Sequence, residues 1–395
     1  MTSYRDVGQI SNELEFNLYN VDAARLISAN GLPITHEVNT RDMVELNVSL
    51  ARNIDELNSG VADYISQLLS TTHNLGGEIY GGASLLTDTD GVTPRWYRTT
   101  SLSEACAQGL LDIASQQIVI GVSDETLGFE LFKVFRDINP VLLALTASSP
   151  FRYSNGRLED TGNQSRRIDQ YAQLCRYFPP SMWRDMPRIE TMDQYHYHLQ
   201  RISDEVNTKL GADQLDANLE ELRRIRDNGN GGFSYVPFDT LEPHQIFWNI
   251  RIRPDHKNPD SVFSLELRVP DMPTTPQRIQ MINSFVLGLA YYIADHGCEN
   301  LPTGFNGTFD DLRTTARYGL DANINGRTIQ DTVNSLRTLA AIGLCERGYN
   351  KAYEKLGVTE RILSDGNDAL HIREINSSNP DELRSYLIDR LSSGE

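Results

Sequence analysis

In the segment Asn12-Glu13-Leu14-Glu15-Phe16-Asn17-Leu18, polar and apolar side chains alternate from Glu13 to Leu18. Successive side chains of an extended strand point to opposite faces, so Leu14, Phe16 and Leu18 share one face. Glu13, Glu15 and Asn17 share the other, where an ordinary half-buried strand carries Thr, Lys or Ser. Two carboxylates side by side on one strand therefore indicate an active-site sheet.

Four further segments alternate in the same way, at 44–50, 117–122, 246–253 and 263–269. No lysine stands on the polar face of any of the five segments, although the face of 117–122 is only weakly polar. Their polar faces add Glu45, Asn47, Ser49, Gln117, Asn249, Arg251, Arg253, Ser264, Glu266 and Arg268. A solvated outer face is the commoner role of a single alternating strand. Five such segments favour one antiparallel sheet with helices over its apolar face and a site on the other.

Four carboxylates would then meet on this polar face, those of Glu13, Glu15, Glu45 and Glu266. Crowded carboxylates raise one another's pKa unless a cation neutralises them. Magnesium takes oxygen ligands and commonly bridges a few carboxylates to substrate phosphates. The arrangement therefore predicts that the face binds a metal-bound nucleotide.

Composition limits the other possibilities. A chain of 395 residues forms one large domain or two, and its net charge of −18 argues against a nucleic-acid partner or an anionic membrane surface. The four cysteines are far apart and sparse, which indicates reduced thiols in the cytoplasm. The most apolar stretch, 282–293, is too short and too polar to cross a bilayer, and no basic-then-apolar leader opens the sequence. We expect a soluble cytoplasmic protein.

Motif searches narrow the chemistry further. The sequence has no GxxxxGK[ST], GxGxxG, HExxH, CxxC or GxSxG motif. P-loop kinases, simple Rossmann enzymes, zincins and α/β-hydrolases therefore lose their usual sequence support. A nucleotide must be held in another way.

Helical spacing and capping signals place the remaining elements. We expect helices at 55–74, 101–114, 124–147, 192–226, 275–295 and 328–347, with Pro140 breaking the third. The segment 148–167 has the composition of a long loop, and 349–395 should contain short helices. The segment 227–237 is either a lid or an exposed hairpin.

Several stretches together resemble the glutamate–cysteine ligase type 2 family of carboxylate–amine ligases. They are Asn-Pro-Val-Leu-Leu-Ala-Leu-Thr-Ala-Ser-Ser-Pro-Phe at 139–151, Ser-Arg-Arg at 165–167, Ala-Arg-Tyr-Gly-Leu-Asp-Ala at 316–322, and Leu-Glu-Leu-Arg-Val-Pro-Asp at 265–271. The last is similar to the family's Glu-x-Arg-x-x-Asp strand. The resemblance runs in order from Asn12 to Cys345.

The resemblance implies an α+β fold, with a curved, mainly antiparallel sheet forming a funnel related to glutamine synthetase. It implies a catalytic domain at 1–345 and a helical extension at 346–395, with ATP and Mg²⁺ or Mn²⁺ bound. ATP would phosphorylate the γ-carboxylate of L-glutamate, and the amine of cysteine would attack the acyl phosphate. The partners are then the small-molecule substrates, and the question of whether the protein forms a homo-oligomer is left open.

The same resemblance implies roles for individual residues. Metal ligands would be Glu13, Glu15, Glu45, Glu266 and Gln117. Catalytic residues would be Arg268, Arg317 and either Arg251 or Arg253, and substrate-binding residues would be Asn47, Ser84, Ser148, Ser149, Arg167 and Asn249.

The chain departs from the family pattern on the substrate-facing strands. Gln117 and Val119 stand where many members have His-x-His-x-Gly, Ser84 lies where many have a Gly-Thr-His-Pro-like segment, and Asn249 replaces an aspartate. The resemblance makes cysteine the default acceptor, and these departures make another amine or amino acid the alternative. A non-catalytic relative that senses nucleotide or glutamate is a third interpretation.

Overall fold

The computed structural model describes residues 6–29, 31–36, 42–84, 86, 113–175, 180–182, 184, 186–210, 249–253, 262–299, 301–302, 305–375 and 379–394. The strands are β1 (Val7–Tyr19), β2 (Ile34–His36), β3 (Met43–Ala51), β4 (Glu78–Tyr80), β5 (Gln116–Val122), β6 (Phe151–Ser154), β7 (Arg157–Asp160), β8 (Ile250–Arg253), β9 (Phe263–Leu267), β10 (Asn323–Ile324) and β11 (Arg327–Thr328).

The helices cover most of the remaining described chain. They are α1 (Ala23–Ala29), α2 (Ile54–Asn74), α5 (Glu125–Asp137), α6 (Asn139–Thr146), α7 (Arg167–Cys175), α8 (Met192–Leu210), α10 (Pro276–His296), α11 (Phe309–Tyr318), α12 (Ile329–Glu346), α13 (Asn350–Lys355), α14 (Gly357–Asp365), α15 (Asp368–Glu374) and α16 (Pro380–Ser393). Short 3₁₀ turns occur at Pro180–Met182 and Gly319–Asp321.

The main sheet has seven strands in the order β2-β3-β1-β5-β9-β8, with β4 also paired to β1. All of its described pairings are antiparallel. The sheet therefore joins strands that are far apart in the sequence, since β1 lies beside β5 and β5 beside β9. The α+β class and mainly antiparallel sheet expected from the sequence are confirmed.

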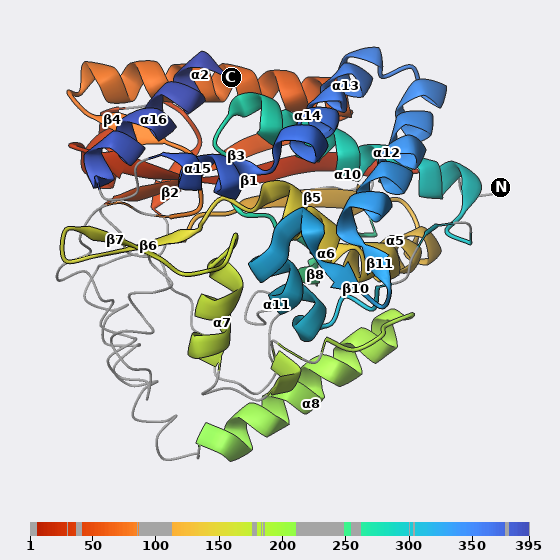
Figure 1. Ribbon diagram of the computed structural model, residues 1–395. Coiled ribbons are helices and arrows are strands. Elements are labelled where there is room, and N and C mark those ends of the chain that lie inside the picture. The colour runs from red at the N-terminus through yellow and green to blue at the C-terminus, as the bar shows by residue number, and fades with distance from the viewer. Residues whose placement is uncertain are drawn as a thin grey trace.

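One face of this sheet carries the hydrophobic core. Leu14, Phe16 and Leu18 of β1 are fully buried, as the alternation predicted. Helix α2 packs on β1 and β3, and α10 packs against α2, α5 and α12. In Figure 1, α2 and the C-terminal helices lie above the strands, and α7 and α8 lie below them.

The other face is also covered rather than open to bulk water. Glu15 and Asn17 are buried and Glu13 is half-buried, although all three are polar. A solvated outer face would leave these side chains exposed. The interpretation of the alternating strands as ordinary surface strands is therefore wrong for β1.

Several predicted helices are confirmed with small shifts at their ends. Asn53 caps α2, Thr275 caps α10 and Thr328 caps α12, each through its side-chain oxygen. The helix predicted at 124–147 is divided as expected, but the division is at Ile138. Pro140 lies in the first turn of α6, where its missing N–H leaves no hydrogen bond unmade.

Two expectations differ from the structure. The segment 148–167 is not one long loop, because it contains the hairpin of β6 and β7, whose turn uses Asn155 and Gly156 at positive φ. Ile113 and Ala114, the last residues of the helix expected at 101–114, are not helical, and Ile113 pairs with Ser84 in an isolated bridge. The rest of that segment, together with 211–248 and the 227–237 segment, lies outside the described residues.

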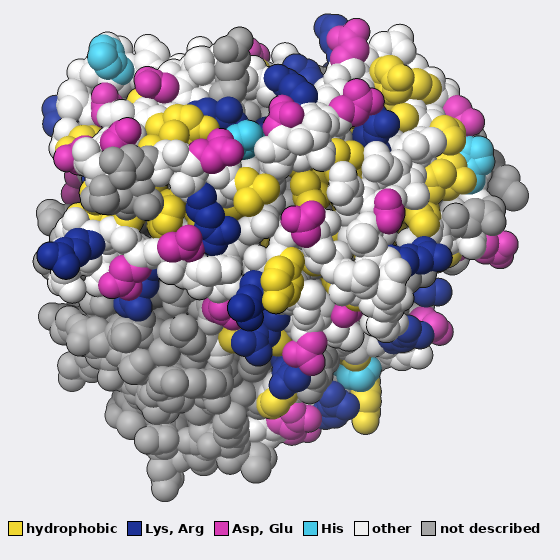
Figure 2. Space-filling view, in the orientation of Figure 1, with side chains coloured by type: hydrophobic (Ala, Val, Ile, Leu, Met, Phe, Trp, Pro, Cys, Tyr) yellow, Lys and Arg dark blue, Asp and Glu magenta, His cyan; other side chains and the backbone are white. Residues whose placement is uncertain are grey.

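The C-terminal helices pack closely on the sheet. Leu383 and Leu387 of α16 and Ile372 of α15 share a small apolar cluster with Tyr80 and Phe151. Whether a domain boundary falls between 345 and 346 stays a prediction. In the part of the chain that the structure describes, no helix is both long and apolar enough to span a membrane. Over the face shown in Figure 2, acidic and basic side chains are largely interspersed.

Candidate active site

Strand register brings the predicted polar side chains into rows across one face of the sheet. Glu15 of β1 lies opposite Glu45 of β3, and Glu13 lies between Asn47 of β3 and Gln117 of β5. Directly paired residues of antiparallel strands point to the same face. The two rows therefore place three carboxylates together on β1 and β3.

A third row continues the face toward the edge strand. Val119 of β5 lies opposite Glu266 of β9, and Glu266 lies opposite Arg251 of β8. The prediction that the five segments share one polar face is confirmed for the residues that the structure describes.

Glu15 and Glu45 are held by neutral donors. The backbone N–H of Ser115 donates to one oxygen of Glu15 (2.5 Å), and the side-chain amide of Gln117 donates to the other (3.0 Å). Asn47 donates to Glu45 (2.9 Å), as does the hydroxyl of Thr35 (3.2 Å). Gln117 thus presents its amide nitrogen to Glu15.

Glu13 and Glu266 are instead paired with arginines. Both oxygens of Glu266 accept hydrogen bonds from Arg251, and its Nη2 to Oε1 distance is 2.9 Å. Arg253 donates to Glu13 at 2.8 Å and lies 3.7 Å from Glu266. Arg251 therefore forms the two-pronged pair with the β9 acid, while Arg253 reaches across to β1.

These different environments shift the pKa values of the acids in different directions. Burial raises the pKa of Glu13, and the charges of Glu266 and Glu45 raise it further. Burial raises the pKa of Glu15 to about 7, although the charge of Arg167 opposes the change. Burial also acts against the ionised form of Glu266, but Arg251 and Arg268 outweigh it and hold that pKa below its usual value. Glu266 is therefore an anion, and Glu15 titrates near neutrality.

The side chains suit a hard divalent ion in kind, because the face carries several carboxylate oxygens. The repulsion that raises the pKa of Glu13 is also what a bound cation would relieve. Within the described ranges, however, no three Asp, Glu, His or Cys side chains already stand in an arrangement that could hold a metal ion. A metal at this face would have to compete with Arg253 for Glu13, and the assignment of ligands stays a prediction.

Two further arginines border the acids. Arg167, at the start of α7, donates to the carbonyl of Val269 (3.0 Å). Its guanidinium carbon lies 5.1 Å from the ring centroid of Tyr171. Arg268 is half-buried on the segment after β9, and its backbone N–H donates to the carbonyl of Asn249 (2.8 Å).

The remaining predicted residues lie elsewhere. The hydroxyls of Ser84, Ser148 and Ser149 are buried and donate to Phe151, Met272 and Asp271 respectively. Arg317 is exposed on α11 and stacks on Tyr318 at 5.4 Å. These contacts hold loops and a helix end together, and the substrate or catalytic roles of the four residues stay predictions.

Asp271 is a buried residue to which sequence reasoning gave no role, although it ends the Glu-x-Arg-x-x-Asp stretch. Its carboxylate accepts from the backbone of Ser148 (3.2 Å) and from the hydroxyls of Ser149 and Ser165 (both 2.9 Å). It thereby ties the segment after β9 to the residues that precede Arg167. The sequence signal that could have identified Asp271 is its fixed spacing from Glu266 in the Glu-x-Arg-x-x-Asp stretch.

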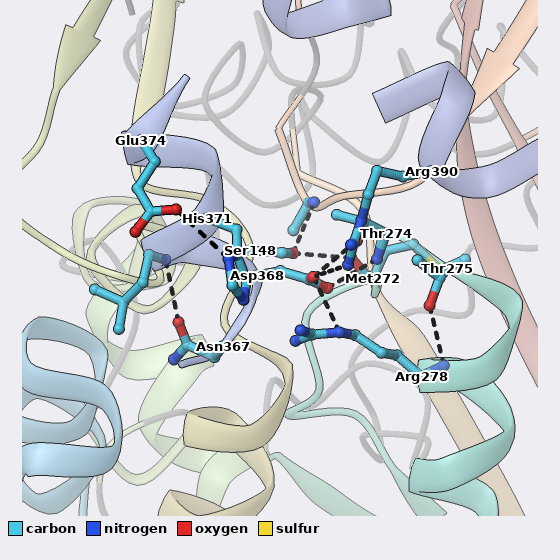
Figure 3. Close-up of polar contacts among 12 residues, drawn as sticks. Ser148, Met272, Thr274, Thr275, Arg278, Asn367, Asp368, His371, Glu374 and Arg390 are labelled. Atoms are coloured by element: carbon cyan, nitrogen blue, oxygen red, sulfur yellow. Dashed lines mark hydrogen bonds and ion pairs between the residues drawn. The ribbon is translucent and has the colours of Figure 1, made fainter. Parts of the chain in front are cut away.

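A second polar cluster anchors the same segment from the other side. Figure 3 shows Arg278 of α10 and Arg390 of α16 converging on Asp368. Each guanidinium lies 3.2 Å from the same carboxylate oxygen. The backbone and hydroxyl of Thr274 also donate to Asp368, at 3.0 and 2.8 Å. The C-terminal helices therefore hold the connection between β9 and α10.

Comparisons with known proteins agree with this geometry. A model of glutamate–cysteine ligase family 2 matches residues 12–367. Among solved structures, the chain is similar to the glutamate–cysteine ligase of Francisella tularensis in complex with AMP, at 12% identity and a TM-score of 0.61, covering 99% of this chain and 89% of that one. No curated protein sequence matches the chain.

A second solved structure is the bifunctional glutathione synthetase of Pasteurella multocida, at 11% identity and a TM-score of 0.59. The match covers 98% of this chain but 52% of that one, so the chain spans about half the length of that protein. At these identities the likeness to both structures shows a shared fold alone. With the family model matched over nearly its whole length, the chain belongs to glutamate–cysteine ligase family 2, a family of ATP-dependent carboxylate–amine ligases.

Proposed function

We propose that the protein uses ATP to phosphorylate the γ-carboxylate of L-glutamate and joins the product to an amine, with cysteine as the default acceptor. The supporting observation is the covered polar face, where Glu13 and Glu266 pair with the two arginines of β8 beside the acids Glu15 and Glu45. Phosphoryl transfer depends mainly on positioning and on neutralising charge. A face of acids and arginines without a protein nucleophile suits that requirement.

In the first step a γ-carboxylate oxygen of glutamate attacks the γ-phosphorus of ATP, the bond to ADP breaks, and an acyl phosphate forms. In the second step the amine nitrogen attacks the acyl carbon, inorganic phosphate leaves, and the nitrogen loses a proton. Magnesium, when bound, would neutralise phosphate charge. Glu13, Glu15 and Glu45 would hold it, and Arg268 would balance negative charge on the transferred group.

Arg251 has a different role in this scheme. Its two hydrogen bonds to Glu266 keep that carboxylate ionised and fixed in orientation on β9. Arg253, whose side chain is 40% exposed, makes a single hydrogen bond to Glu13 and so can leave it when a metal ion arrives. We therefore assign Arg251 to positioning and Arg253 to a counter-ion that exchanges with substrate or metal.

One observation favours an amine substrate other than cysteine. Val119 lies directly between Ser11 of β1 and Glu266 of β9, so the middle of the polar face carries an apolar side chain. An apolar residue at this place offers no hydrogen bond to a polar acceptor group. An amine or amino acid with an apolar side chain is the second candidate.

The test is magnesium-dependent ADP release with ATP, L-glutamate and a panel of acceptors that includes cysteine and apolar amines, with products identified by mass. A γ-glutamyl adduct of one acceptor is expected, and Glu13→Gln should abolish it while the protein stays folded. ADP release at background with every acceptor would instead favour a non-catalytic relative. Normal turnover by Glu13→Gln would refute the metal assignment.

A further inference from the structure

Two guanidinium groups interact electrostatically with Glu15. Arg167 comes from α7, and its charge opposes the rise that burial causes in the pKa of Glu15. Arg268 comes from the end of β9, and the charges of Glu266, Glu13 and Glu15 outweigh the effect of its burial and raise its own pKa. Both cations therefore border the polar face beside the same acid.

Tyr171 lies against the first of these cations. It follows Arg167 by one turn of α7, and its ring stacks under that guanidinium at 5.1 Å. The Nη2 atom of Arg167 also donates to the Tyr171 hydroxyl at 3.5 Å. The same hydroxyl lies within electrostatic reach of Arg268, and the side chain is half-buried. The half-buried phenol thus contacts Arg167 and interacts with Arg268, the two cations that interact with Glu15.

Among the described residues, two donor groups at this place have no hydrogen-bond acceptor. The Tyr171 oxygen accepts from Arg167, and its own O–H has no acceptor among the residues that the structure describes. The Arg268 guanidinium likewise donates to no side chain within the described ranges. Phenol and guanidinium are donors at neutral pH, so a ligand that satisfies both must be an acceptor with negative charge.

We propose that Tyr171, together with Arg167 and Arg268, binds an oxyanion of the substrates, and that Tyr171 is a substrate-contacting residue of this ligase. The inference rests on the proposed function and adds a residue from outside the sheet to its site. Two groups share the required chemistry, the γ-phosphate of ATP and a carboxylate of glutamate. The contribution of the hydroxyl is a hydrogen bond to a charged acceptor, for which a loss of roughly 10-fold in affinity or more is expected.

The test compares equilibrium binding to the full-length wild type and to Tyr171→Phe, which keeps the ring under Arg167 and removes only the hydroxyl. One probe is a non-hydrolysable ATP analogue with Mg²⁺, and the other is L-glutamate with that analogue present. A 10-fold weaker Kd for the analogue would assign the oxyanion to the phosphate. A 10-fold weaker Kd for glutamate alone would assign it to a carboxylate.

Tyr197→Phe is the matched control, because Tyr197 lies on α8 with 65% of its side chain exposed. Its Kd values should equal those of the wild type. If Tyr171→Phe binds both probes as tightly as the wild type, the inference is overturned while the ligase proposal stands. If the wild type itself binds neither probe, both proposals fail together.

Discussion

Replacing Glu15 with glutamine should stabilise the metal-free protein near neutral pH. Burial holds the pKa of Glu15 at about 7 in the folded state, against an ordinary value of 4.5. The folded state therefore binds the proton more tightly than the unfolded chain does. The contribution of Glu15 to stability is greatest below pH 4.5 and is lost as the pH rises toward 7, because the buried carboxylate must ionise. The rise in pKa from 4.5 to about 7 corresponds to a loss of about 3 kcal/mol in the free energy of unfolding above pH 7.

The hydrogen bonds around Glu15 allow this substitution. A glutamine oxygen can accept from the backbone N–H of Ser115 as the carboxylate does. Its NH₂ group can donate to Gln117 once that side-chain amide has turned over, because the present donor and acceptor exchange roles. Glu15→Gln thus removes the charge and keeps both hydrogen bonds that the side chain of residue 15 makes.

The assay is urea unfolding of both proteins with a chelator present, at a series of pH values from 4.5 to 8. The variant should gain stability over the wild type as the pH rises, to a few kcal/mol at pH 8. Glu159→Gln, at an exposed position of β7, should show no such trend. A difference that does not change with pH, or a variant that is less stable at pH 8, would refute the reasoning.

Three other substitutions test the surrounding framework. Arg251→Lys should reduce ADP release at least 10-fold, because lysine cannot make the two-pronged contact with Glu266; turnover equal to wild type would contradict this. Tyr195→Phe removes the hydroxyl that bonds both the N–H and the carbonyl of Ile252 on edge strand β8, so urea unfolding should show a loss of about 2 kcal/mol, and an unchanged midpoint would argue against it. Asp368→Asn should lower the free energy of unfolding by about 3 kcal/mol in the same measurement, because it leaves the buried Arg278 without its counter-ion. An unchanged free energy would mean that the helices of the C-terminal region do not depend on this ion pair.

The strands of the polar face could be predicted because their signal is local. Alternation of period two requires only that one face be apolar, and β1 follows it from Glu13 to Leu18 and β3 from Val44 to Val48. Leu50, expected on the apolar face, is instead 44% exposed, because the register of β3 with β1 shifts beyond Val48. Caps are equally local, so the starts of α2, α10 and α12 were predicted to within a residue. The sharing of one face by all five strands was an inference from composition, and the register confirms it.

Other features could not be predicted because they depend on contacts between distant segments. Nothing near Arg251 and Arg253 indicates which of them opposes Glu266, since that depends on the register of β8 with β9. The roles of the serines depend on Asp271, more than a hundred residues away from Ser148 and Ser149. A hairpin at 151–160 was hidden because its strands are short and mostly exposed, so they lack an apolar alternation.

The pairing of acids with arginines sets how this site must respond to metal and nucleotide. In the metal-free protein Arg253 neutralises Glu13 and Arg251 neutralises Glu266, while Glu15 lowers its cost of burial by keeping a proton up to about pH 7. A divalent ion would displace the proton and the Arg253 contact together, so its affinity should rise with pH between 5 and 8. Arg251 should remain on Glu266, because this ion pair is buried and has two hydrogen bonds.

The displaced Arg253 would then add a positive charge beside the phosphates, which makes nucleotide binding stronger when metal is bound. Affinity for the nucleotide that does not change on adding magnesium would show that the two events are independent.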